Sequence, residues 1–322
     1  KYMLTLGLSL LTVLGLFTGC SPKAETASGS DSLKIVATIF PEYDWARQVL
    51  GDRAGEVQLT LLLDSGTDLH SYQPTAADML TIGECDLFLY NGGESDAWVE
   101  RVLATAANPD RRTLSVMEVL GDSVLEEEVV EGMQEAEDHD HAEGEAHEEE
   151  ADEHVWLSLR NARTACAEIA RVLGELDPDH AAEYQTNAEN YMAELEALDG
   201  EYAALAENAA RRTVLVGDRF PFRYLMDDYG LEYYAAFSGC SAETEASFET
   251  IAFLSGKTEE LALPCILTTE SPQPGVAETI RSNTASGDQT ILQLDSMQSA
   301  GTGDNYLDIM KENLEVLRQA LA

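Results

Sequence analysis

Residues 179–209 read DHAAEYQTNAENYMAELEALDGEYAALAENA. The stretch is rich in Ala, Glu and Leu, which favour helix, and Gly200 is its only strong helix breaker. As a single helix it would extend for about 46 Å, at a rise of 1.5 Å per residue. A helix of that length exceeds what one small core needs, so it predicts a strut that joins two lobes.

Short strands alternate with helices on both sides of this stretch, which favours parallel sheets. The expected strands are 33–39, 57–63, 86–90, 113–116, 213–216, 231–236, 265–268 and 290–294. The expected helices are 42–50, 75–83, 94–106, 159–173, 222–229, 247–261, 276–282 and 305–321. We therefore expect an α/β fold with two (β/α) lobes, each built on a mainly parallel four-stranded sheet. The N-terminal lobe is expected at 33–178, the linking helix at 179–209 and the C-terminal lobe at 210–322. Ligands bind at the carboxyl ends of strands in open α/β sheets, so the cleft between the lobes is the expected site.

The composition is strongly acidic. Of the 322 residues, 19 are Lys or Arg and 60 are Asp or Glu, which gives a formal net charge of −41. Nucleic acid is excluded as a partner, because phosphate contacts need clustered basic side chains. The same charge favours cationic ligands, and metal ions in particular. The hydrophobic content of 44% excludes a wholly disordered chain.

Residues 1–19 are largely apolar and begin with one positive charge at Lys1. The apolar run of roughly 15 residues is shorter than the ~20 that a membrane-spanning helix needs, and it is typical of a secretory signal peptide. The sequence FTGC at 17–20 resembles a bacterial lipobox, so Cys20 is expected to carry a lipid. Residues 20–32 indicate a flexible tether. We therefore expect the protein outside the cytoplasm, lipid-anchored to the cell membrane of a bacterium.

Residues 126–153 contain 15 Asp or Glu and no Lys or Arg. Such a block repels itself, so we expect a disordered loop within the N-terminal lobe. His139, His141 and His147 lie inside it and give the acidic tract a weak metal-binding character. Two interpretations remain open: a solvated loop without a role, or an accessory loop that collects metal for a nearby site.

Four cysteines follow Cys20: Cys85, Cys166, Cys240 and Cys265. They allow three disulfide pairings, and an exported protein permits disulfides. If one pair forms, we favour Cys240 with Cys265, because both lie in the later half of the chain. Buried free thiols are the alternative.

Two histidines stand in contexts that are typical of ordered sites. His70 lies in DLHSYQPT, residues 68–75, directly after an expected strand. His154 begins HVWL, where the acidic block gives way to apolar residues. Either alone would be an ordinary surface or capping histidine, but imidazoles together with carboxylates suit Zn²⁺ and similar divalent ions. His180, at a helix start, is interpreted as structural.

These motifs carry a resemblance to a known family. Residues 63–78, with the pattern D-x-H-x-Y-x-P-T, resemble the first metal-ligand loop of the zinc/manganese ABC-transporter substrate-binding proteins. Residues 154–162 resemble the family's second ligand motif, and the acidic block lies where zinc-binding members carry theirs. Residues 34–45, 213–231 and 292–321 resemble other parts of the family, so the resemblance covers essentially the whole mature chain. It implies two (β/α) lobes, a linking helix and a metal buried in the cleft between them.

The resemblance also implies most of a ligand set. His70 and His154 match the first two ligands of the family. Asp295 matches an acidic fourth ligand, with a turn-forming Asp as the alternative interpretation. Arg219 occupies the position of the usual third histidine, and an arginine stays protonated and cannot coordinate a metal.

The third ligand therefore stays open. Asp218, one residue before the arginine, is the nearest oxygen ligand, and Glu270 is a second carboxylate near the expected cleft. A loop histidine or a water molecule could also fill the position.

The function that the resemblance implies is high-affinity capture of a divalent metal and its delivery to a membrane ABC permease, by a monomer that is not an enzyme. The histidines of the acidic block favour zinc, whereas two histidines with carboxylates also suit manganese. A manganese receptor of the same family is therefore one alternative. A surface adhesin and an extracytoplasmic metallohydrolase are the others, although the chain lacks the H-E-x-x-H motif of zinc hydrolases.

Overall fold

A computed structural model describes residues 32–64, 66–104, 107–134, 150–241, 245–270 and 275–322 of the chain. All described residues belong to one compact unit, Ser32–Ala322. The predicted signal peptide, the lipidated Cys20 and the three histidines of the acidic block lie outside the described residues, so these stay predictions. Within the described part, none of the helices is both long and apolar enough to cross a membrane.

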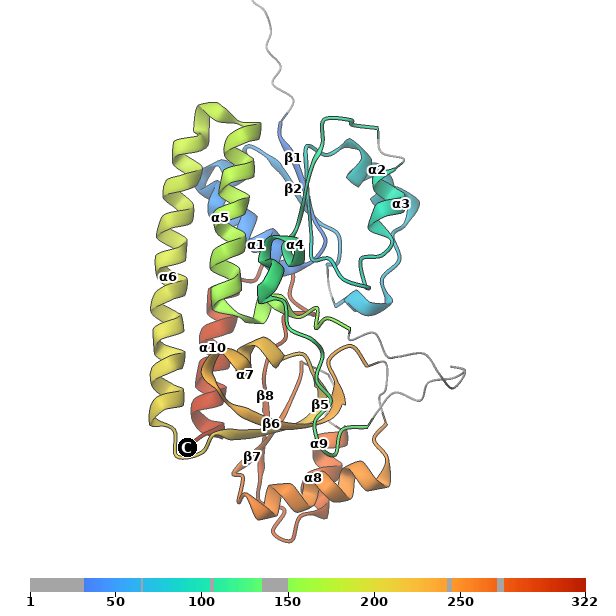
Figure 1. Ribbon diagram of the computed structural model, residues 1–322, viewed down its shortest axis with the longest axis vertical. Coiled ribbons are helices and arrows are strands. Elements are labelled where there is room, and N and C mark those ends of the chain that lie inside the picture. The colour runs from blue at the N-terminus through green and yellow to red at the C-terminus, as the bar shows by residue number, and fades with distance from the viewer. Residues whose placement is uncertain (1–31, 65, 105–106, 135–149, 242–244, 271–274) are drawn as a thin grey trace, which may run out of the picture. The chain divides into compact units, whose positions relative to one another are not determined.

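The N-terminal lobe is built on a four-stranded parallel sheet with the strand order β2-β1-β3-β4 (Figure 1). Its central strand β1 pairs Val36 with Thr60 of β2 on one side and with Phe88 of β3 on the other. Its strands are β1 (Lys34–Ala37), β2 (Gln58–Leu61), β3 (Leu87–Tyr90) and β4 (Arg112–Ser115). Its helical elements are α1 (Phe40–Leu50), η1 (Gly51–Gly55), η2 (Leu69–Ser71), α2 (Ala76–Glu84), α3 (Val99–Leu103), α4 (Val116–Leu120), η3 (Gly121–Ser123), η4 (Val155–Leu157) and α5 (Leu159–Leu176).

The C-terminal lobe repeats this plan with the strand order β6-β5-β7-β8, again parallel. Its strands are β5 (Thr213–Phe220), β6 (Glu232–Ser238), β7 (Cys265–Thr268) and β8 (Thr290–Gln293). Its helices are α7 (Arg223–Tyr229), α8 (Phe248–Glu260), α9 (Gly275–Asn283) and α10 (Tyr306–Ala320). The two four-stranded parallel sheets confirm the fold class that the sequence predicts.

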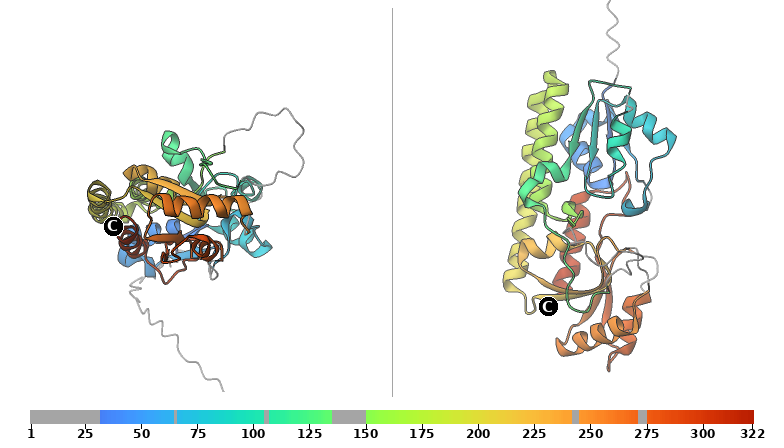
Figure 2. Two further views of the ribbon diagram at one scale, coloured as in Figure 1. Left: turned by 90° about the horizontal axis from the view of Figure 1, so that it is seen from below. Right: turned by 45° about the vertical axis from the view of Figure 1, so that its right-hand side comes forward.

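The linking helix α6 (Ala181–Asn208) leads from the N-terminal lobe to β5, and it lies beside α5 (Figures 1 and 2). It begins two residues later than expected, because Pro178 opens a short 3-10 turn, η5 (Pro178–His180), in front of it. Its buried residues recur every three, four or seven positions, the spacing of one helix face. They are Tyr184, Ala188, Tyr191, Leu195, Leu198, Tyr202 and Ala206.

Tyr306, the first residue of α10, connects the two lobes inside the hydrophobic core. Its ring packs edge-on against Trp45 of α1, with the ring centroids 5.4 Å apart. Its hydroxyl donates to the carbonyl oxygen of Trp156 over 2.6 Å, and its backbone N–H donates to Asp44 over 2.9 Å. Because these contacts are buried, they hold the turn that carries His154 in one position relative to both lobes.

The acidic block is ordered at both ends, which differs from the fully disordered loop that the sequence predicts. Residues 125–134, which we call the strap, pair at their start with the returning chain and at their end with the C-terminal sheet (Figure 1). There Gln134 forms a parallel bridge with Phe237 of β6. Glu128 and Arg223 form an ion pair at 3.0 Å. Backbone pairing and this basic partner therefore offset the self-repulsion of the acidic residues in the strap.

The helix expected at 94–106 is shortened to α3. The residues in front of it use their backbone and side-chain groups elsewhere: Asp96 accepts from the N–H of Gly92 over 2.9 Å, and Ser95 donates its N–H to Glu153 over 2.8 Å. Such local and long-range bonds compete with the first turn of a helix. The result is a loop at the carboxyl end of β3 that lies against the segment before His154.

Candidate metal centre

His70 lies in η2, in the loop that follows β2 at the carboxyl edge of the N-terminal sheet. Asp68 caps this turn, because its Oδ1 accepts a hydrogen bond from the backbone N–H of His70 over 3.0 Å. Leu69 is buried beside it and anchors the turn in the core. The imidazole of His70 is therefore held by a capped and anchored turn, with its side chain 14% exposed.

His154 is the residue before η4 and is completely buried. The carboxylate of Asp152 accepts from its backbone N–H over 2.8 Å and lies 2.9 Å from its ring Nδ1. Val155 and Trp156, which follow, are buried in the core. One carboxylate thus fixes both the backbone and the ring orientation of this histidine.

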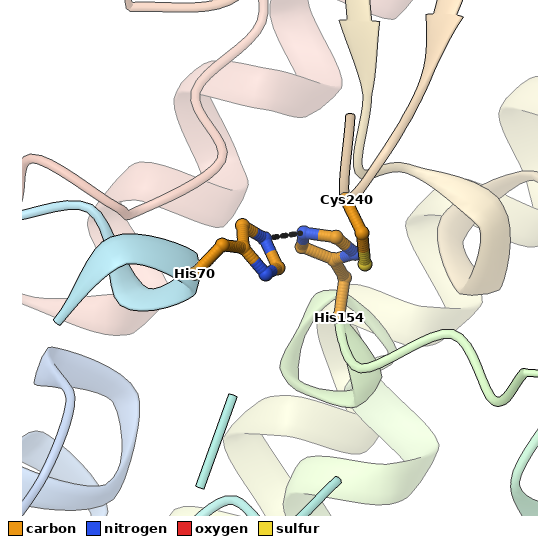
Figure 3. A group of neighbouring side chains, drawn as sticks. All are labelled: His70, His154 and Cys240. Atoms are coloured by element: carbon orange, nitrogen blue, oxygen red, sulfur yellow. Dashed lines mark hydrogen bonds between the residues drawn. The ribbon is translucent and has the colours of Figure 1, made fainter. Parts of the chain in front are cut away.

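The two imidazoles face each other through their Nε2 atoms, which lie 3.3 Å apart (Figure 3). Each Nδ1 atom points instead to an acidic partner: that of His70 lies 2.9 Å from Ser95 Oγ and 3.5 Å from Glu153 Oε2, and that of His154 lies against Asp152. A histidine whose Nδ1 donates to a carboxylate keeps the Nε2 lone pair for a metal. Two nitrogens bound to one tetrahedral zinc at about 2.05 Å stand about 3.3 Å apart, so the separation fits this ion.

Cys240 lies beside the ring of His154, in the turn after β6 of the C-terminal lobe (Figure 3). One ligand atom from each of His70, His154 and Cys240 lies within 4.8 Å of the others. Burial raises the pKa of the Cys240 thiol far above its usual range, and the charges of nearby acidic residues raise it further. The free cysteine is therefore a thiol rather than a reactive thiolate.

All four described cysteines are free thiols. Of the two alternatives that the sequence leaves open, the structure therefore has unpaired thiols and no Cys240–Cys265 disulfide. Cys85, Cys166 and Cys265 are buried, whereas Cys240 is only partly buried.

The three carboxylates expected from the sequence lie at the carboxyl ends of C-terminal strands but do not join the histidines. Asp218 Oδ2 accepts from the hydroxyls of Thr268 and Thr269 over 2.9 and 2.8 Å, and its Oδ1 accepts from the N–H of Arg219. It is absent from the group of ligand atoms that the described residues bring within 4.8 Å of one another, and its role as a candidate third ligand stays a prediction.

Glu270, after β7, and Asp295, after β8, both accept hydrogen bonds from the loop that follows β8. Glu270 accepts from the N–H of Ser296 over 2.9 Å and from that of Gln298 over 3.0 Å. Asp295 Oδ1 accepts from the N–H of Met297 over 2.7 Å, as the turn-forming interpretation predicts. Burial, and next the charge of Glu270, raise the pKa of Asp295 to about 6. Neither carboxylate belongs to the group of ligand atoms within 4.8 Å of one another, and the roles of Glu270 and Asp295 as ligands stay predictions.

The sequence does not indicate three residues that lie beside the two histidines. Cys240 is predicted as a disulfide partner or a buried free thiol, although it follows a strand at the carboxyl edge of the sheet, where ligands gather. Ser95 and Glu153, which orient His70, gave no signal of their own, because 58 residues separate them in the chain.

A small cavity lies near the histidines, although neither of them lines it. It has a volume of about 10 Å³, about the room that one water molecule needs, and is lined in part by Leu69, Trp156 and Gln298. The side-chain nitrogen of Gln298 lies 3.4 Å from His154 Nε2.

Known proteins resemble this chain over nearly all of its length. It is 31% identical over 319 residues to the zinc-binding lipoprotein AdcA of Streptococcus pneumoniae. This match covers 98% of this chain but only 61% of AdcA, so the chain spans less than two thirds of that protein. It is 30% identical over 303 residues to the high-affinity zinc uptake system protein ZnuA of Bacillus subtilis, which covers 94% of this chain and 91% of that protein.

Two solved structures share the fold. The metal-dependent lipoprotein YcdH of Bacillus subtilis superposes with a TM-score of 0.72 at 26% identity, covering 90% of this chain and 99% of that one. The Zn(II)-bound ZnuA-like domain of Streptococcus pneumoniae AdcA gives 0.69 at 28% identity, with coverages of 90% and 99%. Residues 35–320 also match the family described as "Zinc-uptake complex component A periplasmic". With this match, two parallel-sheet lobes and two facing histidines, the chain belongs to the ZnuA family of zinc-uptake component A proteins.

Proposed function

We propose that this protein captures Zn²⁺ outside the cytoplasm and delivers it to the permease of an ABC transporter. One observation carries the proposal: the Nε2 atoms of His70 and His154 lie 3.3 Å apart, and the Nδ1 of each ring is held by acidic or hydroxyl groups. The names of the relatives, zinc-binding lipoprotein AdcA and zinc uptake system protein ZnuA, support zinc as the ion.

The zinc ion is the cargo, so the site has to bind it and later release it. His70 and His154 bind as neutral imidazoles, and protons compete with the ion, so capture weakens on acidification. Both histidines come from turns of the N-terminal lobe, His70 from η2 and His154 from the residue before η4.

Zinc titration of the purified protein tests the site. The wild type should bind one Zn²⁺ tightly, and the His70→Ala/His154→Ala double variant should lose most of this affinity. His180→Ala is a matched control, because His180 also lies beside a carboxylate, with its Nδ1 2.8 Å from Asp177, but in η5, away from the two facing rings. Unchanged tight binding in the double variant would contradict the site.

Delivery to a permease separates transport from adhesion and hydrolysis. Expression in a bacterium that lacks its own zinc-binding component should restore growth when zinc is scarce, and the double histidine variant should not. An adhesin or a hydrolase would not restore growth. We propose a binding protein rather than an enzyme, because the relatives named above are a zinc-binding lipoprotein and a zinc uptake protein.

We further propose that the protein works as a monomer, anchored to the membrane through a lipid on Cys20. A Cys20→Ala variant should then appear in the soluble fraction rather than the membrane fraction. The histidines 139, 141 and 147 are proposed to collect zinc for the main site. Deletion of residues 135–149 should slow uptake at scarce zinc and leave the equilibrium affinity of the main site unchanged.

A further inference from the structure

Cys240 brings a sulfur atom to the two proposed zinc ligands from the other lobe (Figure 3). His70, His154 and Cys240 form the group of potential metal ligands that the described residues bring within 4.8 Å of one another. Two imidazoles and one thiolate make a ligand set that zinc accepts readily. The three residues come from η2, from the turn before η4 and from the turn after β6, so the group needs both lobes to form.

The turn that carries Cys240 is built for close approach to His154. A Cβ atom placed on Gly239 would lie 2.8 Å from His154 Cε1 and 2.9 Å from the carbonyl oxygen of Phe220. Real side chains do not tolerate contacts this short, so only a glycine fits at 239. The missing side chain allows the backbone to pass directly beside the imidazole, and this places the next residue, Cys240, next to the ring.

The strap fixes Cys240 to the segment that carries His154. Glu127 Oε1 accepts a hydrogen bond from the backbone N–H of Cys240 over 3.2 Å. The backbone N–H of Glu127 donates to the carbonyl of Glu150 over 2.8 Å, and Asp152 donates its N–H to Leu125 over 2.9 Å. Asp152 also holds the ring of His154. This short series of hydrogen bonds therefore positions the Cys240 thiol and the His154 imidazole relative to each other.

The side chains at the position of the family's third metal ligand bond to other groups. Arg219, which stands where the family pattern has a third histidine, directs its guanidinium to Asp68 over 2.9 Å. Asp218 accepts bonds from two threonines and from a backbone N–H. A sulfur atom from the neighbouring strand end is what the structure offers in their place.

We propose that Cys240 supplies a thiolate as the third metal ligand, and that the site consequently selects thiophilic ions such as Zn²⁺ and Cd²⁺ over Mn²⁺. This rests on the proposed function, since it concerns the same site. The S–H bond breaks as the S–Zn bond forms, the proton passes to solvent, and nothing is oxidised or reduced. Thiolate favours soft and borderline ions, whereas Mn²⁺ favours oxygen ligands, so a sulfur in the set decides between the two metals.

Cobalt spectroscopy tests the sulfur ligand directly. Co²⁺ is added to metal-free wild type, to Cys240→Ser and to Cys85→Ser. The last is a matched control, because a serine hydroxyl can still donate to the carbonyl of Ile82, 3.2 Å from Cys85 Sγ. The wild type and the control should show a sulfur-to-cobalt charge-transfer band together with visible d–d bands. Cys240→Ser should keep the d–d bands and lose the charge-transfer band.

Competition titrations give an independent readout. The preference for Zn²⁺ over Mn²⁺ should fall by about tenfold or more in Cys240→Ser. Circular dichroism and thermal unfolding establish that each variant is folded.

The outcomes separate the two proposals. Wild type that binds Co²⁺ and Zn²⁺ without a charge-transfer band, or a band that persists in Cys240→Ser, would overturn the thiolate ligand and leave the proposed function intact. Wild type that binds neither ion would overturn both.

Discussion

Arg219 and Asp68 form an ion pair across the two lobes, beside the proposed zinc ligands. Arg219 Nη1 lies 2.9 Å from Asp68 Oδ2, while Asp68 Oδ1 accepts from the backbone N–H of His70. Burial raises the pKa of Asp68, but the hydrogen bond and charge of Arg219 outweigh it, so the pKa lies below its usual value. An arginine that cannot bind metal thus positions the turn of a histidine that we propose binds it.

Removal of this pair should weaken zinc capture modestly. In Arg219→Gln the turn of His70 keeps its cap but loses its connection to β5, so bound zinc should dissociate faster. The pair is partly exposed, with side chains 28% and 34% accessible, and such pairs contribute ~0.2–1 kcal/mol. We expect zinc affinity to fall about two- to fivefold. Stopped-flow release of zinc to a chelator measures the faster dissociation.

Arg163→Gln is the control for this change. It removes an exposed ion pair with Glu196 at 3.3 Å, between α5 and α6, and should leave zinc release unchanged. Equal effects of the two variants, or no effect of Arg219→Gln, would show that the inter-lobe pair has no part in zinc retention.

The carboxylate of Asp152 should contribute more to zinc affinity than the ion pair. It lies 2.9 Å from His154 Nδ1 and thereby orients the ring toward the proposed zinc position. In Asp152→Asn the shape is retained and the charge is lost, so zinc affinity should fall by about 10- to 100-fold. Competition with a zinc-binding dye measures it. Asp177→Asn makes the same change beside His180, and a loss of the same size there would point to a general charge effect.

The alternation of strands and helices was enough to predict both sheets, because each strand is an apolar run closed by turn residues. The strap and the shortened α3 could not be predicted in this way. Ser95 bonds to Glu153 across 58 residues, and Gln134 pairs with Phe237 across the lobes. Local sequence patterns do not contain these partners, so the acidic block was predicted to be disordered along its whole length.

The site could be predicted as far as its local motifs extend. His70 and His154 lie in recognisable segments, and the structure brings them together. A third ligand stays a proposal, because it depends on side-chain direction, which the sequence does not specify. Asp218 stands at the right edge of the sheet but turns to Thr268 and Thr269, whereas Cys240 turns to the histidines. Residue position at a strand end was therefore not sufficient.

The buried carboxyl of Glu42 should make stability fall as pH rises. Glu42 is 1% exposed, and its Oε1 has no hydrogen-bond partner among the described residues. Burial, and next the charge of Asp96, raise the pKa of Glu42 from 4.5 to about 8. The folded protein therefore holds a proton that the unfolded chain releases above pH 4.5. This contribution to stability is complete below pH 4.5 and is lost as the pH rises to about 8.

Glu42→Gln tests this dependence, because glutamine is neutral at every pH. Urea unfolding of the metal-free protein measures the free energy of unfolding. Between about pH 5 and about pH 9 this free energy should rise in the variant relative to the wild type, by on the order of a few kcal/mol. Burial raises the pKa of Asp96 to about 7. Asp96 should therefore cause a smaller decline of the free energy of unfolding with pH in both proteins. Glu196→Gln, at an exposed position, should follow the wild type. Parallel curves for wild type and Glu42→Gln would mean that Glu42 does not hold the proton.

Gly239→Ala should damage zinc binding more than it damages the fold. The new methyl group would lie 2.8 Å from His154 Cε1 and 2.9 Å from the carbonyl of Phe220, so the turn that carries Cys240 has to move away from the ring. We expect zinc affinity to fall about tenfold or more, as when a supporting group of a metal ligand is lost, and the free energy of unfolding to fall by about 1–3 kcal/mol. In Gly256→Ala of α8 the added Cβ meets nothing within 4 Å, and alanine favours helix, so this variant should bind zinc normally and unfold no more easily. Isothermal titration and urea unfolding of both variants measure the two effects separately. Normal zinc binding by Gly239→Ala would mean that the close approach of the turn to His154 is not needed for capture, and would count against Cys240 as a ligand as well.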